Sequence, residues 1–141
     1  MISLDTNLLV YAHRAGVPEH QRAKQVIEDA LNHPAGCAVA LPCVSEFWMV
    51  VTHTRSSTKP SRPSQARAFL AGLFSAGVSV LYPKAGLAEH ILTIAAELDL
   101  QGQKIFDLQI ALISKQAGAR ELWTHDANFP AIPGLIVRYP L

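Results

Sequence analysis

Two aspartates each stand at the end of a short, largely apolar segment that is typical of a buried strand. Asp5 directly follows residues 2–4, and Asp126 lies just beyond residues 121–124. An apolar strand does not tolerate an unpaired carboxylate inside it, so each aspartate marks a strand end. Ligands of parallel α/β sheets bind at the carboxyl ends of the strands. The alternatives are that Asp5 or Thr6 caps the following helix and that Asp126 closes an Asx turn.

Two more acidic residues lie in stretches that are otherwise apolar and have a helical pattern. Glu46 precedes the apolar residues 47–51, and Asp107 lies between residues 105–106 and the mostly apolar run 108–113. Either one could be a charge that stabilises a helix N-terminus. The seven other acidic residues are expected on helix surfaces, in turns or at a strand start, where solvation accounts for them.

These four carboxylates, Asp5, Glu46, Asp107 and Asp126, are expected to converge. Strand ends and the starts of the following helices open onto the same edge of a parallel sheet. Carboxylates gathered there repel one another unless a cation neutralises them. Oxygen ligands without His or Cys favour Mg²⁺ or Mn²⁺ over Zn²⁺. Such a centre suits the attack of a metal-activated water on a phosphodiester.

The elements that would position these residues alternate along the chain. Parallel strands that alternate with helices predict a three-layer α/β/α sandwich around a central parallel sheet, with residues 1–141 forming a single domain. The apolar patterns predict strands at 2–4, 37–41, 78–82, 121–124 and 135–138, and helices after Asn7 and at 19–32, 44–53, 64–76, 85–98 and 105–117, with a polar loop at 55–63.

Composition narrows the class of protein. Half of the 141 residues are hydrophobic and 16% are charged, which is typical of a globular chain. The sequence has no apolar run of transmembrane length and no signal peptide pattern. Cys37 and Cys43 are expected as free, buried thiols, which favours a cytoplasmic location. The net charge of +1 means that any attraction to nucleic acid must come from a local patch.

Four segments, in this order and at these separations, resemble the PIN-domain ribonucleases, and more narrowly the VapC-like toxins of bacterial toxin–antitoxin pairs. The segments are Leu4-Asp5-Thr6-Asn7, the helix with Glu46, Ile105-Phe106-Asp107-Leu108-Gln109-Ile110-Ala111, and Thr124-His125-Asp126-Ala127-Asn128-Phe129.

The resemblance implies a PIN-like α/β fold and metal-dependent endoribonuclease activity. Asp5, Glu46, Asp107 and Asp126 match the acidic metal-site positions, with Asp5 as the central ligand. Asp107 would be a second ligand or would hold a metal-bound water, and Glu46 and Asp126 would act through water. The residues expected to orient the carboxylates without binding the ion are Thr6, Asn7, Thr124 and Asn128; Asn7 and Asn128 could instead be caps.

The resemblance also implies partners: RNA as substrate, a cognate antitoxin that occupies the mouth of the site, and a second copy of the chain in a homodimer. A phosphate backbone would need a local group of cations beside the carboxylates. We define the basic rim as the residues expected to contact RNA or antitoxin, although an ordinary soluble loop is an equal alternative: Arg14, Arg55, Lys59 and Arg62.

Other functions fit less well. A non-catalytic PIN-like module that binds RNA or protein would not need all four carboxylates. A phosphatase with Asp5 as nucleophile usually has a second aspartate two residues later, where this chain has Asn7. No G-x-G-x-x-G motif follows the first strand, which disfavours a dinucleotide-binding domain.

Overall fold

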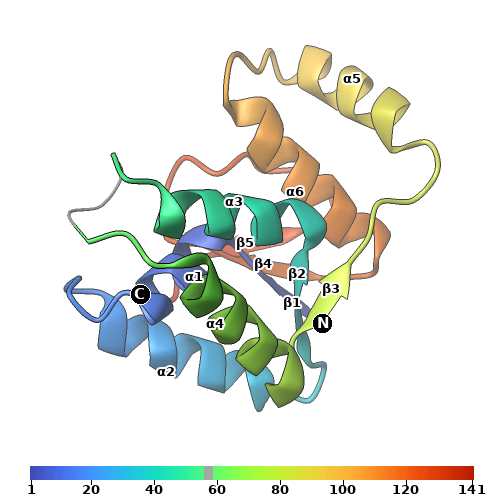
Figure 1. Ribbon diagram of the computed structural model, residues 1–141. Coiled ribbons are helices and arrows are strands. Elements are labelled where there is room, and N and C mark those ends of the chain that lie inside the picture. Colours follow the sequence, from blue (N-terminus) through green and yellow to red (C-terminus); the bar gives the residue numbers. More distant parts are fainter. Residues whose placement is uncertain (56–58) are drawn as a thin grey trace.

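The computed structural model describes residues 1–55 and 59–141 and contains a five-stranded, fully parallel sheet with the strand order β3-β2-β1-β4-β5 (Figure 1). The strands are β1 (Ile2–Leu4), β2 (Cys37–Ala40), β3 (Ser79–Leu81), β4 (Glu121–Trp123) and β5 (Ile136–Arg138). The helices are α1 (Thr6–His13), α2 (His20–Leu31), α3 (Leu41–Thr52), α4 (Pro63–Ala76), α5 (Leu87–Glu97) and α6 (Lys104–Gln116).

The direction of each crossover sorts the helices into two layers. The chain moves from β1 through β2 to β3 in one direction along the sheet, and then returns past β1 to β4. Right-handed crossovers therefore place α1 to α4 on one face and α5 and α6 on the other. Figure 1 shows α2 and α4 together on one side of the strands, and α5 and α6 on the opposite side. The predicted three-layer α/β/α architecture is confirmed.

The central strand β1 is enclosed on both faces and both edges. Ile2 and Leu4 are fully buried, and between them the Ser3 hydroxyl pairs with the Ser114 hydroxyl of α6 at 2.7 Å. Ser3 pairs with Ala38 of β2 on one edge and with Leu122 of β4 on the other. A buried hydroxyl needs such a partner, so this contact fixes α6 against the strand that ends at Asp5.

The helix α3 begins earlier than the sequence pattern predicts. Residues 37–41 were expected to form the strand, with Pro42 as its stop, but Leu41 already belongs to the helix and Pro42 occupies its first turn. Proline suits that position because its missing N–H would have no partner there. Glu46 consequently lies in the second turn of α3, beyond the reach of an N-terminal dipole effect, so the macrodipole interpretation of this residue is wrong.

Other boundaries shift by one to three residues and leave the element order unchanged. Part of the polar loop predicted at residues 55–63 lies outside the described residues. Phe47 of α3 is fully buried, whereas the neighbouring Trp48 is 39% exposed. No helix within residues 1–55 and 59–141 is both long enough and apolar enough to cross a membrane.

Candidate active site

Asp5 lies at the carboxyl end of the central strand and forms the base of the candidate site. Its backbone N–H extends the pairing with β4 by donating to the carbonyl of Trp123 at 2.9 Å. Its Oδ1 accepts a 2.8 Å hydrogen bond from the backbone N–H of Thr6, so Asp5 is the N-cap of α1. The capping alternative is thus correct, and it leaves Oδ2 to face the other side chains of the site.

A hydrogen-bonded network around Asp5 Oδ2 joins β1 to the loop after β4. The Thr124 hydroxyl donates to Oδ2 at 2.7 Å, and the Asn7 amide nitrogen lies 3.3 Å from the same oxygen. The Thr124 oxygen in turn accepts from the Asn7 side chain at 3.2 Å and from the backbone N–H of Asp126 at 3.0 Å. The network holds the Asp5 carboxylate in one orientation.

Burial makes Asp5 unusual among the acidic residues. Its side chain is 5% exposed, and burial raises its pKa from 3.8 to about 6. The hydrogen bonds from Thr124 and Thr6 lower this pKa, whereas the charges of Asp107 and Asp126 raise it. Loss of solvation is therefore the main cause of the raised pKa, and repulsion from the nearby Asp107 and Asp126 adds to it.

Glu46 comes to the site from α3. Burial raises its pKa, and the charges of Asp5 and Asp107 raise it further, while the nearby Thr6 hydroxyl lowers it. Within the described part of the chain, the buried Thr6 Oγ1 has no partner at hydrogen-bonding distance. An orphaned buried hydroxyl is costly, so a water or ligand bound beside Glu46 would satisfy a group that the protein leaves open.

Asp107 and Asp126 lie across the site from Glu46. Both are close to the ammonium of Lys104, which was not among the predicted site residues. The Lys104 Nζ is 3.8 Å from Asp107 Oδ2 and 3.5 Å from Asp126 Oδ2. Burial raises the pKa of Asp107, the Lys104 charge lowers it, and the Asp126 charge raises it. The spacing of three residues between Lys104 and Asp107, which lie on one face of a helix, is the sequence signal that could have identified this lysine.

Asp126 also forms the Asx turn that was its alternative interpretation. Its Oδ1 accepts a 2.9 Å hydrogen bond from the backbone N–H of Asn128. The Asn128 carbonyl accepts from the Lys104 ammonium at 2.8 Å. Asn128 thus contacts Asp126 and Lys104 through its backbone N–H and carbonyl.

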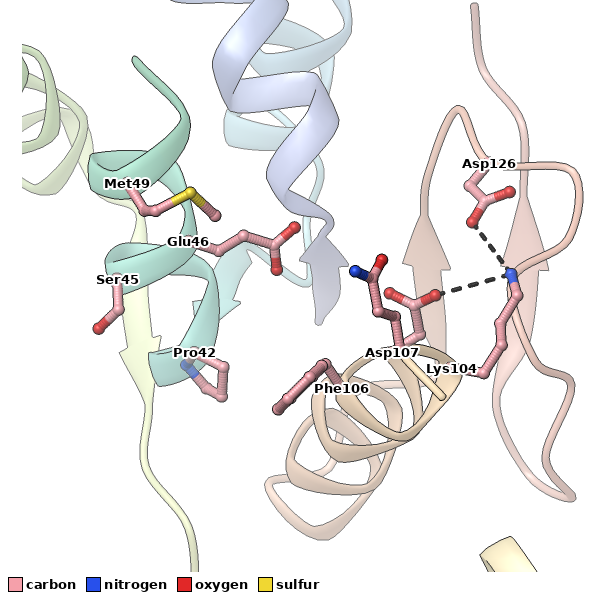
Figure 2. A pocket seen from close by; sticks show the side chains of 9 residues that line it. Pro42, Ser45, Glu46, Met49, Lys104, Phe106, Asp107 and Asp126 are labelled. Carbon is pink, nitrogen blue, oxygen red and sulfur yellow. Dashed lines mark ion pairs between the residues drawn. The ribbon is translucent and has the colours of Figure 1, made fainter. Parts of the chain in front are cut away.

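A cavity of about 660 Å³ is lined by three of the four carboxylates, those of Glu46, Asp107 and Asp126. In Figure 2, Glu46 points into it from α3, and Lys104 and Asp107 of α6 face it from the other side together with Asp126. Ser45 and Gln103 add polar groups. Its apolar wall consists of Pro42, Met49 and Phe106. The cavity can therefore accept a ligand that has both charged and apolar parts.

A second, smaller cavity of about 260 Å³ lies on the α1 side of Glu46, which lines both spaces. Asn7, Tyr11 and Arg14 are among its other lining residues. The Arg14 guanidinium also donates a 2.9 Å hydrogen bond to the carbonyl of Val50. This arrangement places Arg14, one member of the predicted basic rim, beside the acidic centre.

The other three residues of the basic rim lie between α3 and α4. The backbone N–H of Arg55 donates to His53 Nδ1 at 2.9 Å, and Arg62 is the N-cap of α4. Lys59 lies two residues before Ser61, whose hydroxyl pairs with His13 Nε2 at 2.7 Å. Because His13 directly precedes Arg14, this hydrogen bond holds the α4 side of the loop next to the end of α1.

The donor set of the site matches a hard divalent cation. It offers carboxylate oxygens, while His and Cys are absent from the residues lining either cavity. Among the described residues, no group of three His, Cys, Asp or Glu side chains is arranged to enclose a metal ion. Mg²⁺ commonly takes only one or two carboxylates and keeps several waters, so it does not require such an enclosed group.

Comparison with known proteins agrees with the fold and gives the family of the chain. The PIN domain family profile matches residues 2–135, and the chain therefore belongs to the PIN domain family. It is 29% identical over 142 residues to the VapC ribonuclease Mb2897 of Mycobacterium bovis, covering 100% of this chain and 96% of the relative. The prediction of a PIN-domain ribonuclease of the VapC type is confirmed by this full-length similarity.

Solved structures show the same fold at lower sequence identity. VapC20 of Mycobacterium tuberculosis, a toxin that cleaves the sarcin–ricin loop, superposes with a TM-score of 0.70 at 19% identity and 92% coverage of both chains. A toxin–antitoxin complex from Klebsiella pneumoniae gives a TM-score of 0.66 at 21% identity, covering 100% of this chain and 98% of that one. Proteins of this fold have therefore been crystallised together with antitoxins.

Proposed function

We propose that this protein is a VapC-type toxin that cleaves RNA phosphodiester bonds with the help of Mg²⁺ or Mn²⁺. The observation that carries the proposal is the buried carboxylate of Asp5, whose pKa of about 6 reflects burial and the charges of Asp107 and Asp126. A divalent cation would relieve this repulsion. The ribonuclease names of the full-length relatives support the choice of RNA as substrate.

The proposed metal ligands are Asp5 and Asp107, with Glu46 and Asp126 acting through water. A divalent cation at such a site supplies positive charge that activates water and stabilises the phosphodiester transition state. Thr124 and Asn7 hold the Asp5 carboxylate in one orientation, so no reorganisation of this group is needed during the reaction. The unpartnered Thr6 hydroxyl beside Glu46 fits the ordered water of such a site.

We infer three further features, which concern an antitoxin, a dimer and the cellular location. A cognate antitoxin would neutralise the protein by covering the mouth of the site, as the toxin–antitoxin complex of the Klebsiella pneumoniae protein suggests. Dimerisation with a second copy follows from the family resemblance. The free thiols of Cys37 and Cys43, both buried, are consistent with action in the reducing cytoplasm.

Induced expression in bacteria tests the proposal directly. We expect the wild type to arrest growth and to produce discrete new RNA ends, and the Asp5→Asn variant to do neither while accumulating as a folded protein. The exposed Asp29→Asn variant on α2 is the matched control and should arrest growth like the wild type.

A purified-protein assay separates the metal requirement from the toxicity. EDTA should stop RNA cleavage, and added Mn²⁺ or Mg²⁺ should restore it. Cleavage that continues in chelator would rule out the metal-dependent mechanism. Normal growth and unchanged RNA ends with the wild type would favour the alternative of a non-catalytic RNA- or protein-binding module.

A further inference from the structure

Lys104 places one ammonium group between two of the proposed metal-site carboxylates. Its Nζ lies 3.8 Å from Asp107 on its own helix and 3.5 Å from Asp126 in the loop after β4, and Figure 2 shows it between the two. The ammonium also donates a 2.8 Å hydrogen bond to the Asn128 carbonyl. One cation therefore connects both segments that carry these aspartates.

The positive charge of Lys104 partly neutralises the negative charge of the Asp107 and Asp126 carboxylates. Asp107 and Asp126 repel each other and also raise the pKa of Asp5. An ammonium at 3.5–3.8 Å from both reduces that repulsion. A divalent cation would serve the same purpose at the same carboxylates, so the lysine and the metal compete for the same negative charge.

The surroundings of Lys104 allow it to move. The side chain is 38% exposed and lines the 660 Å³ cavity, so the ammonium can leave Asp107 and Asp126 without opening the core. Both ion pairs also exceed the usual length of a direct charge-assisted hydrogen bond. The only close contact of the ammonium given by the described residues is the one to a backbone carbonyl.

We propose that Lys104 is a displaceable internal cation, which neutralises Asp107 and Asp126 in the metal-free protein and weakens the binding of a divalent metal ion until it moves aside. The inference rests on the proposed metal-dependent function. It makes Lys104 a positioning residue that keeps the empty carboxylate site assembled and sets the metal concentration at which the site fills.

Replacement of Lys104 by a neutral side chain of similar length tests this role. In Lys104→Met, isothermal titration with Mn²⁺ should give about tenfold tighter binding than the wild type, because the competing charge is gone. Without metal, the same variant should melt at a lower temperature, and saturating Mn²⁺ should raise its melting temperature by more than that of the wild type. Lys104→Arg retains the charge and should bind Mn²⁺ like the wild type.

Lys84 provides a matched control. Its exposed ammonium also donates to a backbone carbonyl, that of Gln116 at 2.9 Å, but has no carboxylate beside it among the ion pairs of the described residues. Lys84→Met removes the same charge from the molecule and should leave Mn²⁺ affinity unchanged. Equal tightening in both lysine variants would mean a general charge effect and would overturn the inference.

The outcomes separate this inference from the proposed function. Equal or weaker Mn²⁺ binding in Lys104→Met than in the wild type would overturn the competition and leave the metal-dependent nuclease intact. Failure of the wild type and of Lys104→Met to bind Mn²⁺ at all would overturn both. Tighter binding in Lys104→Met alone, with wild-type affinity in Lys104→Arg, is the result that the inference requires.

Discussion

At the scale of single residues, Asp5 combines two properties that usually exclude each other. Its carboxylate accepts hydrogen bonds from Thr6, Thr124 and Asn7, which favour ionisation, and yet burial keeps its pKa near 6. The loss of solvation thus outweighs the hydrogen bonds. The ionised form of this carboxylate destabilises the metal-free fold, and a bound cation would reverse that effect.

The stability of the metal-free protein should therefore depend on pH through Asp5. A pKa of 3.8 when unfolded and about 6 when folded means that the folded state holds the proton more tightly, so stability is lost as the pH rises from about 4 to above 6; a shift of this size corresponds to at most about 3 kcal/mol. Asp5→Asn should escape this loss. Urea unfolding at pH 4.5 and pH 7.5 in EDTA should show a smaller decrease for the variant.

Asp29→Asn, an exposed substitution of the same kind, should follow the wild type at both pH values. A decrease in Asp5→Asn as large as that of the wild type would show that other groups cause the pH dependence, such as Glu46 and Asp107, whose pKa values are also raised.

The site residues were predictable from sequence where strand ends and helix starts determine the position, as for Asp5 and Asp107. The hydrogen-bonding partners of the site residues were not predictable in this way. The orphaned hydroxyl of Thr6 and the backbone contribution of Asn128 depend on side-chain geometry that spacing does not determine. Lys104 was missed because the predicted helix began at residue 105, whereas Lys104 is the first residue of α6.

At the scale of elements, two helices bring carboxylates to the site from different parts of the sequence. The helix α3 carries Glu46 and α6 carries Asp107, and the two helices contact each other. Apolar periodicity predicted both helices. The order of the strands was not predictable in this way, because a parallel run of similar apolar segments does not specify which strand lies next to which.

The buried face of α6 can be tested with one substitution. Leu112 is 1% exposed in the core, and Leu112→Asp should lower the free energy of unfolding by more than about 4 kcal/mol because it buries an unpaired charge. Thermal melting followed by circular dichroism measures the effect. Leu92→Asp makes the same change at a position on α5 that is 69% exposed and should melt like the wild type. Equal melting temperatures for both variants would mean that the assigned face of α6 is wrong.

At the scale of the whole molecule, the net charge of +1 provides no long-range attraction for RNA. Of the basic rim, Arg14 lies beside the acidic centre, where it lines the same small cavity as Glu46, while Arg55, Lys59 and Arg62 are the members expected to extend the positive charge between α3 and α4. Local attraction beside a negatively charged site would align a phosphate backbone with the carboxylates instead of binding it over the entire surface.

RNA binding by the Asp5→Asn protein should therefore depend only moderately on salt. If each member of the basic rim contacts one phosphate of a single strand, the slope of log K against log salt is about −3, and Arg14→Ala makes it shallower by about 0.7. Filter binding or fluorescence anisotropy at several salt concentrations gives these slopes. Arg22→Ala, which removes an exposed arginine bound to the Pro140 carbonyl, should leave the slope unchanged. An unchanged slope in Arg14→Ala would mean that Arg14 does not contact an RNA phosphate.

The first strand of the chain lies at the centre of the sheet, and this affects when the protein can become active during synthesis. During synthesis, one edge of β1 can pair with β2 soon after β2 is made. The other edge can pair only after β4 has been made, more than a hundred residues later. Until Thr124 and Asp126 have left the ribosome, Asp5 lacks the hydroxyl that donates to its Oδ2 and the nearby Asp126 carboxylate. A prematurely terminated chain would therefore lack part of the candidate active site. Interrupted translation of the mRNA would then release fragments without ribonuclease activity.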